Sequence, residues 1–387
     1  MKRFNIALPI AALASFWIST AAAENWNSHG PNVAPPWLGD VRTTVYKEDD
    51  VTDDLLTAGL GKTGLGGLAP VVTDPTDAAQ LRRLAIHTNY RAILDITPGG
   101  GYGTLYGPNV RSDGMITTDE GKIAGTEYIA YADDGSGRSN VTLMVQVPAT
   151  FDPTKPCIVT GTSSGSRGVY GAIGSSGEWG LKRGCAVAYA DKGSGNGAHY
   201  LQDNTINRIE GVRADATAAG SASNFTANIT AAQRQQFNSN TPNRLAFKHA
   251  HSQLNPEKDW GRDTLRAIEF AFFVLNEQFG KPLPNGKKLR TIRSGDTVVI
   301  ASSVSNGGGA ALQAAEQDDD KLIDGVAVTE PVIQINPSQD PVIRRGSLPA
   351  YTAGSRPLAD YFTFANLYQP CAALSTRAAG SPRGCAW

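Results

Sequence analysis

The stretch TVVIASSVSNGGGAALQAAEQ (297–317) combines a strand signal with a helix signal, and the two meet at Ser305. Residues 297–304 are rich in Val, Ile and Thr, which favour a buried β-strand. Residues 306–317 contain Ala, Leu, Gln and Glu, which favour a helix. The glycines between them allow the backbone to turn sharply and the two elements to approach closely. We therefore predict that a buried strand turns abruptly into a helix at Ser305.

The same alternation of strand and helix continues on both sides of this stretch. Further strands are predicted at 157–162, 185–193 and 324–335, with a loop and short helix at 171–184 between the first two. Strands that alternate with helices favour a parallel sheet covered by helices on both faces. The predicted fold class is therefore α/β, with a mostly parallel sheet flanked by helices.

The clearest helix in the chain is predicted at 262–280. Its apolar residues recur every three or four positions and mark one buried stripe: Leu265, Ile268, Phe272, Leu275 and Phe279. Asp263 is a candidate N-terminal cap, and Gly280 is a candidate C-terminal stop.

The first 150 residues have a different order of elements. A strand is predicted at 41–48, helical composition at 77–95 and a glycine-rich loop at 97–109. Residues 126–149 contain two strands around Asp-Asp-Gly-Ser-Gly, which is typical of a β-hairpin.

The N-terminus has the three parts of a secretory signal. Lys2 and Arg3 form the charged start, residues 5–18 the apolar stretch, and Ala21 to Ala23 a small-residue cleavage site. The apolar stretch is short for a membrane span, and no second candidate follows it. We expect cleavage near Ala23, a secreted or periplasmic location and no remaining membrane anchor.

Composition indicates a globular protein without an obvious charged partner. The chain has 387 residues, of which 41% are hydrophobic and 18% charged. Removing Lys2 and Arg3 from 35 basic residues leaves 33 against 36 acidic ones, a net charge near −3. Neither nucleic acid nor an anionic membrane is expected as a partner, and composition does not indicate an oligomeric state.

We divide the chain into a signal peptide (1–23), a wrapping segment (24–76) and an α/β core (77–340). The core contains a long polar insertion at 194–258. Residues 341–387 are interpreted as the start of a lid or of the remaining core.

Four cysteines allow three pairings in an exported chain. Cys157 and Cys185 each open a predicted strand, and if these strands are parallel neighbours, the two sulfurs lie at the same sheet edge. Cys371 and Cys385 would then close a small loop. Buried free thiols are the alternative, and the spacing does not decide between them.

Ser305 has the surroundings of a nucleophile. In α/β-hydrolases a Gly-x-Ser-x-Gly segment on a strand-to-helix turn exposes the reactive hydroxyl. Here Gly307 matches the pattern, while Ser303 replaces the first glycine with another small residue. The alternative is a loop serine that only caps the following helix.

A serine nucleophile also needs donors for the developing oxyanion. In such folds one donor is the amide after the nucleophile, here Asn306, and the other comes from the loop after the third strand. The segment 163–168 is in the corresponding place, and Ser164 and Gly165 are the candidate donors. An exposed Gly/Ser turn is the alternative.

Patterns for cofactors and metals are weak. Residues 61–63 (Gly-Lys-Thr) resemble the end of a phosphate loop, but Leu56 stands where that loop needs glycine. A loose dinucleotide pattern at 193–198 is not followed by a helical pattern. His249 and His251 have no matching Cys, Asp or Glu cluster, so a structural or substrate-contact role is favoured. We expect neither metal nor organic cofactor.

With these residues in view, the chain resembles the D-(-)-3-hydroxybutyrate oligomer hydrolase family over roughly residues 35–372. The resemblance is carried by long, unusual segments: DDLLTAGLGKTGL (53–65), GGYGTLYGPNV (100–110), GTEYIAYADDG (125–135), SSGSRGVYGAIG (163–174), KHAHSQLNPEKDWGRDTLRAIEFAF (248–272) and ASSVSNGGGAALQAAEQD (301–318). It implies an exported esterase that cuts short 3-hydroxybutyrate oligomers to monomers, after a polyhydroxybutyrate depolymerase has acted. The serine of the family's charge relay corresponds to Ser305.

The chain also departs from that family. Members are considerably longer, and all five histidines here precede Ser305: His29, His87, His199, His249 and His251. In α/β-hydrolases the acid and histidine follow the serine. The acid is unplaced here, with Glu330, at the end of the following strand, as a candidate. We therefore expect an N-terminal portion of such an enzyme, incomplete on its C-terminal side and weakly active or inactive.

A non-catalytic binding protein on the same scaffold is the alternative function. It would hold an oligoester or sugar in its glycine- and tyrosine-rich loops. Its candidate contacts are Tyr102, Tyr106, Trp179 and Tyr200, although such aromatics more often serve in packing.

Overall fold

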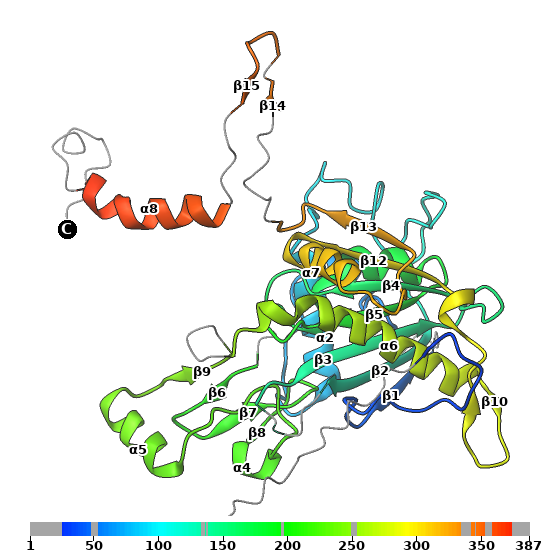
Figure 1. Cartoon of the computed structure of the whole chain (residues 1–387), viewed down its shortest axis with the longest axis horizontal. Coiled ribbons are helices and arrows are strands. Elements are labelled where there is room, and N and C mark those ends of the chain that lie inside the picture. Colours follow the sequence, from blue (N-terminus) through cyan, green and yellow to red (C-terminus); the bar gives the residue numbers. More distant parts are fainter. Residues whose placement is uncertain are drawn as a thin grey trace, which may run out of the picture.

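The computed structural model describes residues 25–47, 53–132, 136, 138–194, 197–248, 254–333, 342–344, 346–352 and 358–373. At its centre lies a seven-stranded sheet of order β1-β2-β3-β5-β4-β12-β13 (Figure 1). The strands are β1 (Arg42–Tyr46), β2 (Gly125–Ala132), β3 (Val141–Pro148), β4 (Cys157–Thr162), β5 (Ala186–Ala190), β12 (Val298–Val304) and β13 (Gly325–Thr329).

The sheet is mixed. Strands β5, β4, β12 and β13 pair in parallel, as the alternation of strand and helix predicts. The β1–β2, β2–β3 and β3–β5 pairs are antiparallel. The hairpin predicted at 126–149 is confirmed as β2 and β3, and the carboxyl ends of β5, β4 and β12 meet at one edge.

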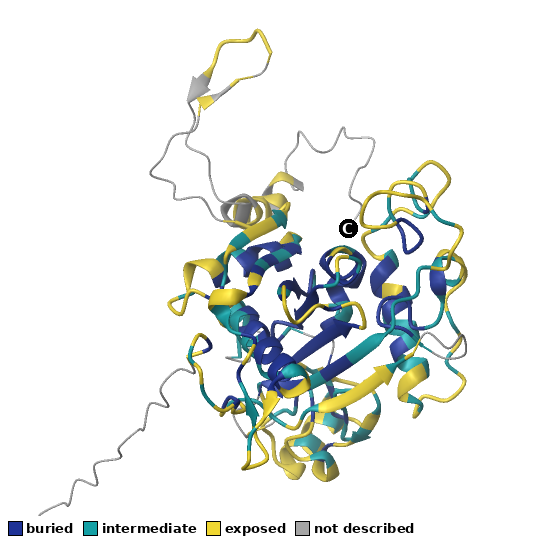
Figure 2. Cartoon of the chain, turned by 90° about the vertical axis from the view of Figure 1, so that its right-hand side faces the viewer, coloured by how far each residue is buried: buried dark blue, intermediate teal, exposed yellow. Residues whose placement is uncertain are grey.

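Two layers of helices cover the sheet. On one face lie α6 (Trp260–Phe279) and α7 (Ser305–Glu316), side by side. On the other face lie α2 (Ala78–Arg91), the short helices η1 (Val169–Ala172) and η2 (Ile173–Gly177), and α3 (Glu178–Leu181). Figure 2 shows the buried residues concentrated in the strands and in the helices that face them.

Alternation along β5 explains why the two faces differ. Ala186, Ala188 and Ala190 point toward the cluster that contains α6, whereas Val187 and Tyr189 join the cluster under α2. Side chains alternate between the faces of a strand. The alanines leave space for the large α6 residues, so that helix can lie close to the sheet.

Helix α6 carries the predicted apolar stripe. Ile268, Phe272 and Leu275 are buried, and Leu265 and Phe279 are partly buried against the same cluster. Gly280 ends the helix, as predicted, and its N–H donates to the Asn276 carbonyl at 2.9 Å.

The predicted capping role of Asp263 is wrong. A 3₁₀ turn, η4 (Pro256–Asp259), leads directly into the helix, which therefore begins at Trp260. Asp263 consequently lies one turn inside α6 and is buried.

The polar insertion forms its own small layer at one end of the molecule (Figure 1). Its described residues form a four-stranded antiparallel sheet of order β8-β7-β6-β9 with helices beside it. These are β6 (His199–Tyr200), β7 (Thr205–Asn207), β8 (Arg213–Asp215), β9 (Leu245–Ala246), α4 (Ala216–Ala219) and α5 (Ala231–Asn240).

The remaining elements are short or peripheral. They are α1 (Gly61–Gly66), η5 (Ser294–Asp296), the pair β10 (Lys281–Pro282) and β11 (Lys288–Leu289), the pair β14 (Val342–Ile343) and β15 (Tyr351–Thr352), and α8 (Leu358–Ala373). Figure 1 shows β14, β15 and α8 apart from the sheet, and residues 362–369 of α8 are exposed. In the wrapping segment, Trp26 is buried and stacks on Phe272.

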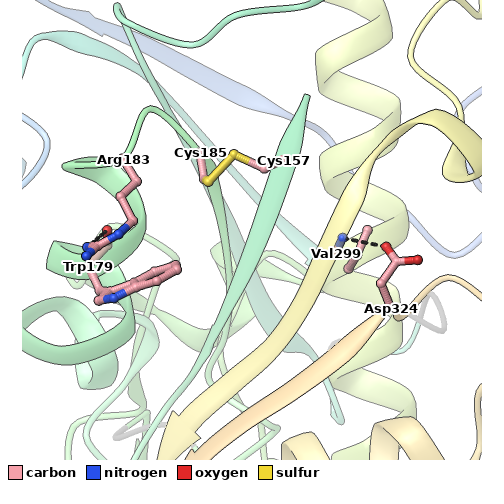
Figure 3. Close-up of a disulfide and its surroundings, with 6 residues drawn as sticks. All are labelled: Cys157, Trp179, Arg183, Cys185, Val299 and Asp324. Atoms are coloured by element: carbon pink, nitrogen blue, oxygen red, sulfur yellow. Dashed lines mark hydrogen bonds between the residues drawn. A yellow bond between two sulfur atoms is a disulfide. The ribbon is translucent and has the colours of Figure 1, made fainter. Parts of the chain in front are cut away.

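A disulfide joins Cys157 and Cys185 (Figure 3). Ile158 of β4 is in register with Ala186 of β5, so the preceding cysteines are neighbours, with Cα atoms 4.8 Å apart. The pairing that the sequence left open is thereby confirmed for these two residues. The side chain of Cys371 and all of Cys385 lie outside the described residues, as do the predicted signal peptide and His249 and His251.

Candidate active site

Ser305 lies at the point where β12 ends and α7 begins, as predicted. It is exposed, and its backbone has φ of +55°, in the left-handed region that residues other than glycine seldom adopt. Such strain persists only where the surrounding structure imposes it, and it is concentrated at functional sites. The geometry is that of a sharp turn that presents the serine hydroxyl to solvent.

Close packing under Ser305 imposes this turn. A Cβ on Gly307 would lie 2.4 Å from the Thr162 carbonyl oxygen and 2.5 Å from the Ser303 Oγ. Ser303 is buried and donates its hydroxyl to the same carbonyl at 2.6 Å. Ser303 thus fits in place of the first glycine of the pattern because its side chain has a partner inside the sheet.

The loop 163–168 follows β4 and lies directly beside the first turn of α7. The Gly165 N–H donates to Asn306 Oδ1 at 2.6 Å, so the two segments are joined. The Ser163 N–H is also occupied, since it donates to the Ala190 carbonyl at 2.8 Å. Ser164 N–H makes no hydrogen bond within the part of the chain that the structure describes.

The three candidate oxyanion donors differ in whether their N–H already has a hydrogen-bond acceptor. Asn306 is the second residue of α7, and the first four N–H groups of a helix have no intrahelical partner. Its amide and that of Ser164 are therefore the available donors. Gly165, the third candidate, has an N–H that the Asn306 side chain already holds. Sequence reasoning considered only the Asn306 backbone and missed this role of its side chain.

The described histidines lie in other parts of the molecule. The His87 ring contacts the Gly67 carbonyl, and His29 contacts Arg293. His199, in the insertion, accepts from the Ala227 N–H through Nδ1 and contacts Asn204 through Nε2. None of these three has a hydrogen bond to Ser305.

The candidate acid Glu330 is exposed just after β13 and has φ of +46°. Two residues later, the Val332 N–H donates to the Ser305 carbonyl at 3.1 Å, so this segment passes beside the serine. Glu330 is therefore near the site, and its role as the acid stays a prediction.

The aromatic residues proposed for ligand binding do not form one surface. The Tyr102 hydroxyl donates to the Lys62 carbonyl at 2.7 Å, and the Tyr106 hydroxyl donates to the Gly100 carbonyl at 2.8 Å. Trp179 of α3 stacks with Arg183 near the disulfide (Figure 3). Tyr200 stacks with an arginine of the separate small sheet.

Within the described ranges, no group of three or more His, Cys, Asp or Glu side chains could hold a metal ion, and no helix is long and apolar enough to span a membrane. A surface hollow of about 290 Å³ lies where α7 connects to β13, lined by Asp318 and Lys321 among others. It is at the opposite end of β12 from Ser305 and does not belong to this site.

Fold and site together define an α/β protein with an exposed serine on a strained strand-to-helix turn, beside a loop with an available amide. The chain belongs to the 3HB-oligomer hydrolase (3HBOH) family, whose sequence model matches residues 18–387. The family resemblance predicted from sequence segments is thereby confirmed.

Several proteins of similar sequence carry the corresponding name. The chain is 60% identical over 376 residues to the D-(-)-3-hydroxybutyrate oligomer hydrolase of Albidiferax ferrireducens, covering 96% of this chain and 53% of that protein. Equally named proteins of Polaromonas naphthalenivorans and Burkholderia ambifaria are 63% and 60% identical over 346 residues, covering 89% of this chain and 49% of each relative. The chain thus spans about half the length of these relatives. No solved structure matches it.

Proposed function

We propose that this chain supplies the nucleophile and the oxyanion-binding loop of a serine esterase that hydrolyses 3-hydroxybutyrate oligomers. The observation that carries the proposal is Ser305, exposed at φ of +55° and tied to the loop 163–168 through Asn306. The names of the relatives supply the substrate.

In the proposed reaction, Ser305 Oγ attacks the ester carbonyl and loses its proton to a base. The carbonyl oxygen becomes an oxyanion that accepts hydrogen bonds from the Asn306 and Ser164 amides. The tetrahedral intermediate collapses, the alcohol leaves with a proton, and an acyl-enzyme remains on Ser305. Water then attacks the acyl group and releases the acid, which regenerates the hydroxyl.

The described residues provide no histidine beside Ser305 to accept its proton. A serine hydroxyl is a weak nucleophile without an adjacent general base. All five histidines precede Ser305 in the sequence, and the three described ones are engaged elsewhere. We therefore propose that this chain by itself hydrolyses the 3-hydroxybutyrate dimer weakly or not at all.

For the fold we propose an α/β-hydrolase-like architecture. Counted from β2, β4 is the third strand, and the loop after it is where that architecture provides an oxyanion donor. The turn between β12 and α7 supports the same assignment.

We further propose that the protein is exported to the periplasm or beyond. The Cys157–Cys185 disulfide supports this, because such bridges persist in oxidising compartments. Fractionation of a producing cell tests it, and retention of the whole chain with the uncleaved N-terminus in the cytoplasm would contradict it.

An active-site-directed fluorophosphonate tests the nucleophile. Because Ser305 has no identified base, we expect one adduct that forms slowly, over hours with excess probe. Mass spectrometry should locate it on Ser305, and Ser305→Ala should abolish it. Ser302→Ala is the matched control, since that serine lies on the same strand and contacts Ser176 instead. Labelling that persists in Ser305→Ala overturns the assignment.

Assays of dimer hydrolysis and oligomer binding complete the test. Robust hydrolysis that depends on Ser305 would show that a base lies within this chain and would refute the expected weak activity. Tight binding of oligomers without any labelling of Ser305 would support the non-catalytic alternative.

A further inference from the structure

Lys192 is a buried cation at the edge of the sheet that carries Ser305. It follows β5 by two residues and has no exposed surface. Its backbone φ is +49°, again in the left-handed region. A buried ammonium and a strained backbone are both unfavourable for folding. Because both costs fall on Lys192, a specific contact of its ammonium group should explain why a lysine is buried here.

The ammonium of Lys192 contacts the loop 163–168. Its Nζ donates to the Gly165 carbonyl at 2.8 Å and to Ser194 Oγ at 3.3 Å, and it lies 4.9 Å from the centre of the Trp260 ring. Burial lowers the pKa of Lys192 to about 8, against the opposing effect of Asp191. The amine is a donor in either protonation state, so the contact with the carbonyl survives titration.

Four side chains together fix the peptide planes of this loop, those of Asn306, Arg167, Lys192 and Ser163. Asn306 Oδ1 accepts the Gly165 N–H, and Arg167 Nε donates to the Ser164 carbonyl at 2.6 Å. Both contacts hold the plane between Ser164 and Gly165, because a peptide group is planar. Lys192 holds the next plane through the Gly165 carbonyl at 2.8 Å, and the Ser163 hydroxyl donates to the same carbonyl at the longer distance of 3.1 Å. The loop is thus bound on both sides of Gly165. The Ser164 N–H belongs to the preceding peptide plane, which is joined to these two at the Ser164 Cα, so its direction is restrained through that one residue.

We propose that Lys192 is a positioning residue that holds the loop 163–168 so that the Ser164 amide meets the oxyanion formed at Ser305. The proposal deepens the proposed function and rests on it. Preorganised donors are effective because they need no reorganisation during reaction, and losing one typically reduces the rate about 100- to 1000-fold. A donor left in place but poorly oriented should lose part of that, on the order of 10-fold or more.

A pair of matched variants tests this role. Lys192→Met keeps the length of the side chain and removes its donor. Lys182→Met is the control, because Lys182 is also largely buried and donates to a loop carbonyl, that of Gly107 at 2.6 Å. It pairs with Glu178 as well, and within the described residues it has no hydrogen bond to 163–168. Hydrogen exchange followed by mass spectrometry should show at least 10-fold faster exchange within 163–168 for Lys192→Met only. Unchanged exchange there overturns the proposal.

The reaction of Ser305 with the fluorophosphonate gives the second readout. We expect the maximal labelling rate of Lys192→Met to fall about 10-fold or more while the probe concentration for half-maximal rate stays constant. Lys182→Met should retain the rate of the parent chain. Equal losses in the two variants would indicate a structural role only and would overturn the proposal.

Two further outcomes are distinguishable. If Ser305 is unreactive in every variant, including the parent chain, the proposed nucleophile fails while the exchange result still reports on the loop. If Lys192→Met does not fold, Lys192→Arg takes its place, since a larger guanidinium in this fully buried position must displace the Gly165 carbonyl. Exchange within 163–168 that is unchanged in Lys192→Arg then refutes the positioning role.

Discussion

Removing the Cys157–Cys185 disulfide should destabilise the protein by an amount that follows from the chain it encloses. The two cysteines are 28 residues apart, and the closed loop contains β4, the loop 163–168 and α3. Cross-linking restricts the unfolded chain, and for a loop of this length the chain-entropy relation gives about 3.5 kcal/mol at 25 °C. Most single domains are stable by only about 5–15 kcal/mol, so the loss should be readily measured.

Equilibrium unfolding in urea, followed by tryptophan fluorescence, measures this loss. Three samples are compared: the oxidised chain, the chain with dithiothreitol, and the double variant Cys157→Ala, Cys185→Ala. We expect the last two to agree with each other and to lie about 3 to 4 kcal/mol below the first in free energy of unfolding. Alkylation of the folded, unreduced protein should leave Cys157 and Cys185 unmodified.

The disulfide and Ser305 lie at opposite edges of the sheet, because Cys157 opens β4 and the loop beside Ser305 follows its end. The rate of Ser305 labelling should therefore be the same for oxidised and reduced protein wherever both remain folded. A difference in stability below about 1 kcal/mol, well under the loop-entropy figure, or alkylation of both cysteines without reductant would refute the reasoning.

Two further predictions concern the core near the site. Gly307→Ala places a methyl group 2.4 Å from the Thr162 carbonyl oxygen. This clash should destabilise the protein by about 1–3 kcal/mol and slow Ser305 labelling. In the helical control Gly66→Ala, the nearest atom to the new methyl group is 3.4 Å away, so this variant should be tolerated. Burial raises the pKa of Asp263 to about 7, so the folded protein favours the neutral carboxyl. The contribution of this group to the free energy of unfolding is fully present below about pH 4 and is lost as the pH rises through 7. Asp263→Asn should therefore raise the free energy of unfolding at pH 8 by at most about 4 kcal/mol and change it little near pH 4. Urea unfolding at the two pH values measures both effects. An equal effect at pH 4 and pH 8 would contradict the raised pKa.

Local sequence patterns were sufficient for several elements of the fold. The hairpin of β2 and β3, the apolar stripe of α6 and the strand-to-helix turn at Ser305 each depend on residues within about 25 positions of one another. The wrong assignment of Asp263 as a cap has a local cause as well. The 3₁₀ turn before α6 continues directly into the helix and moves its start to Trp260, and helix boundaries are the least predictable part of a helix.

By itself, then, the sequence determined the strand-to-helix turn at Ser305, the family and the parallel part of the sheet, because these follow from periodicity and from long matching segments. Tertiary structure alone decided that the Gly165 amide is held by a side chain 141 residues away, that Lys192 is buried against the same loop and that Cys157 pairs with Cys185. The physical reason is the order of the strands. Placing β4 between β5 and β12 brings the ends of three distant segments together, and no local pattern in any one of them encodes its neighbours.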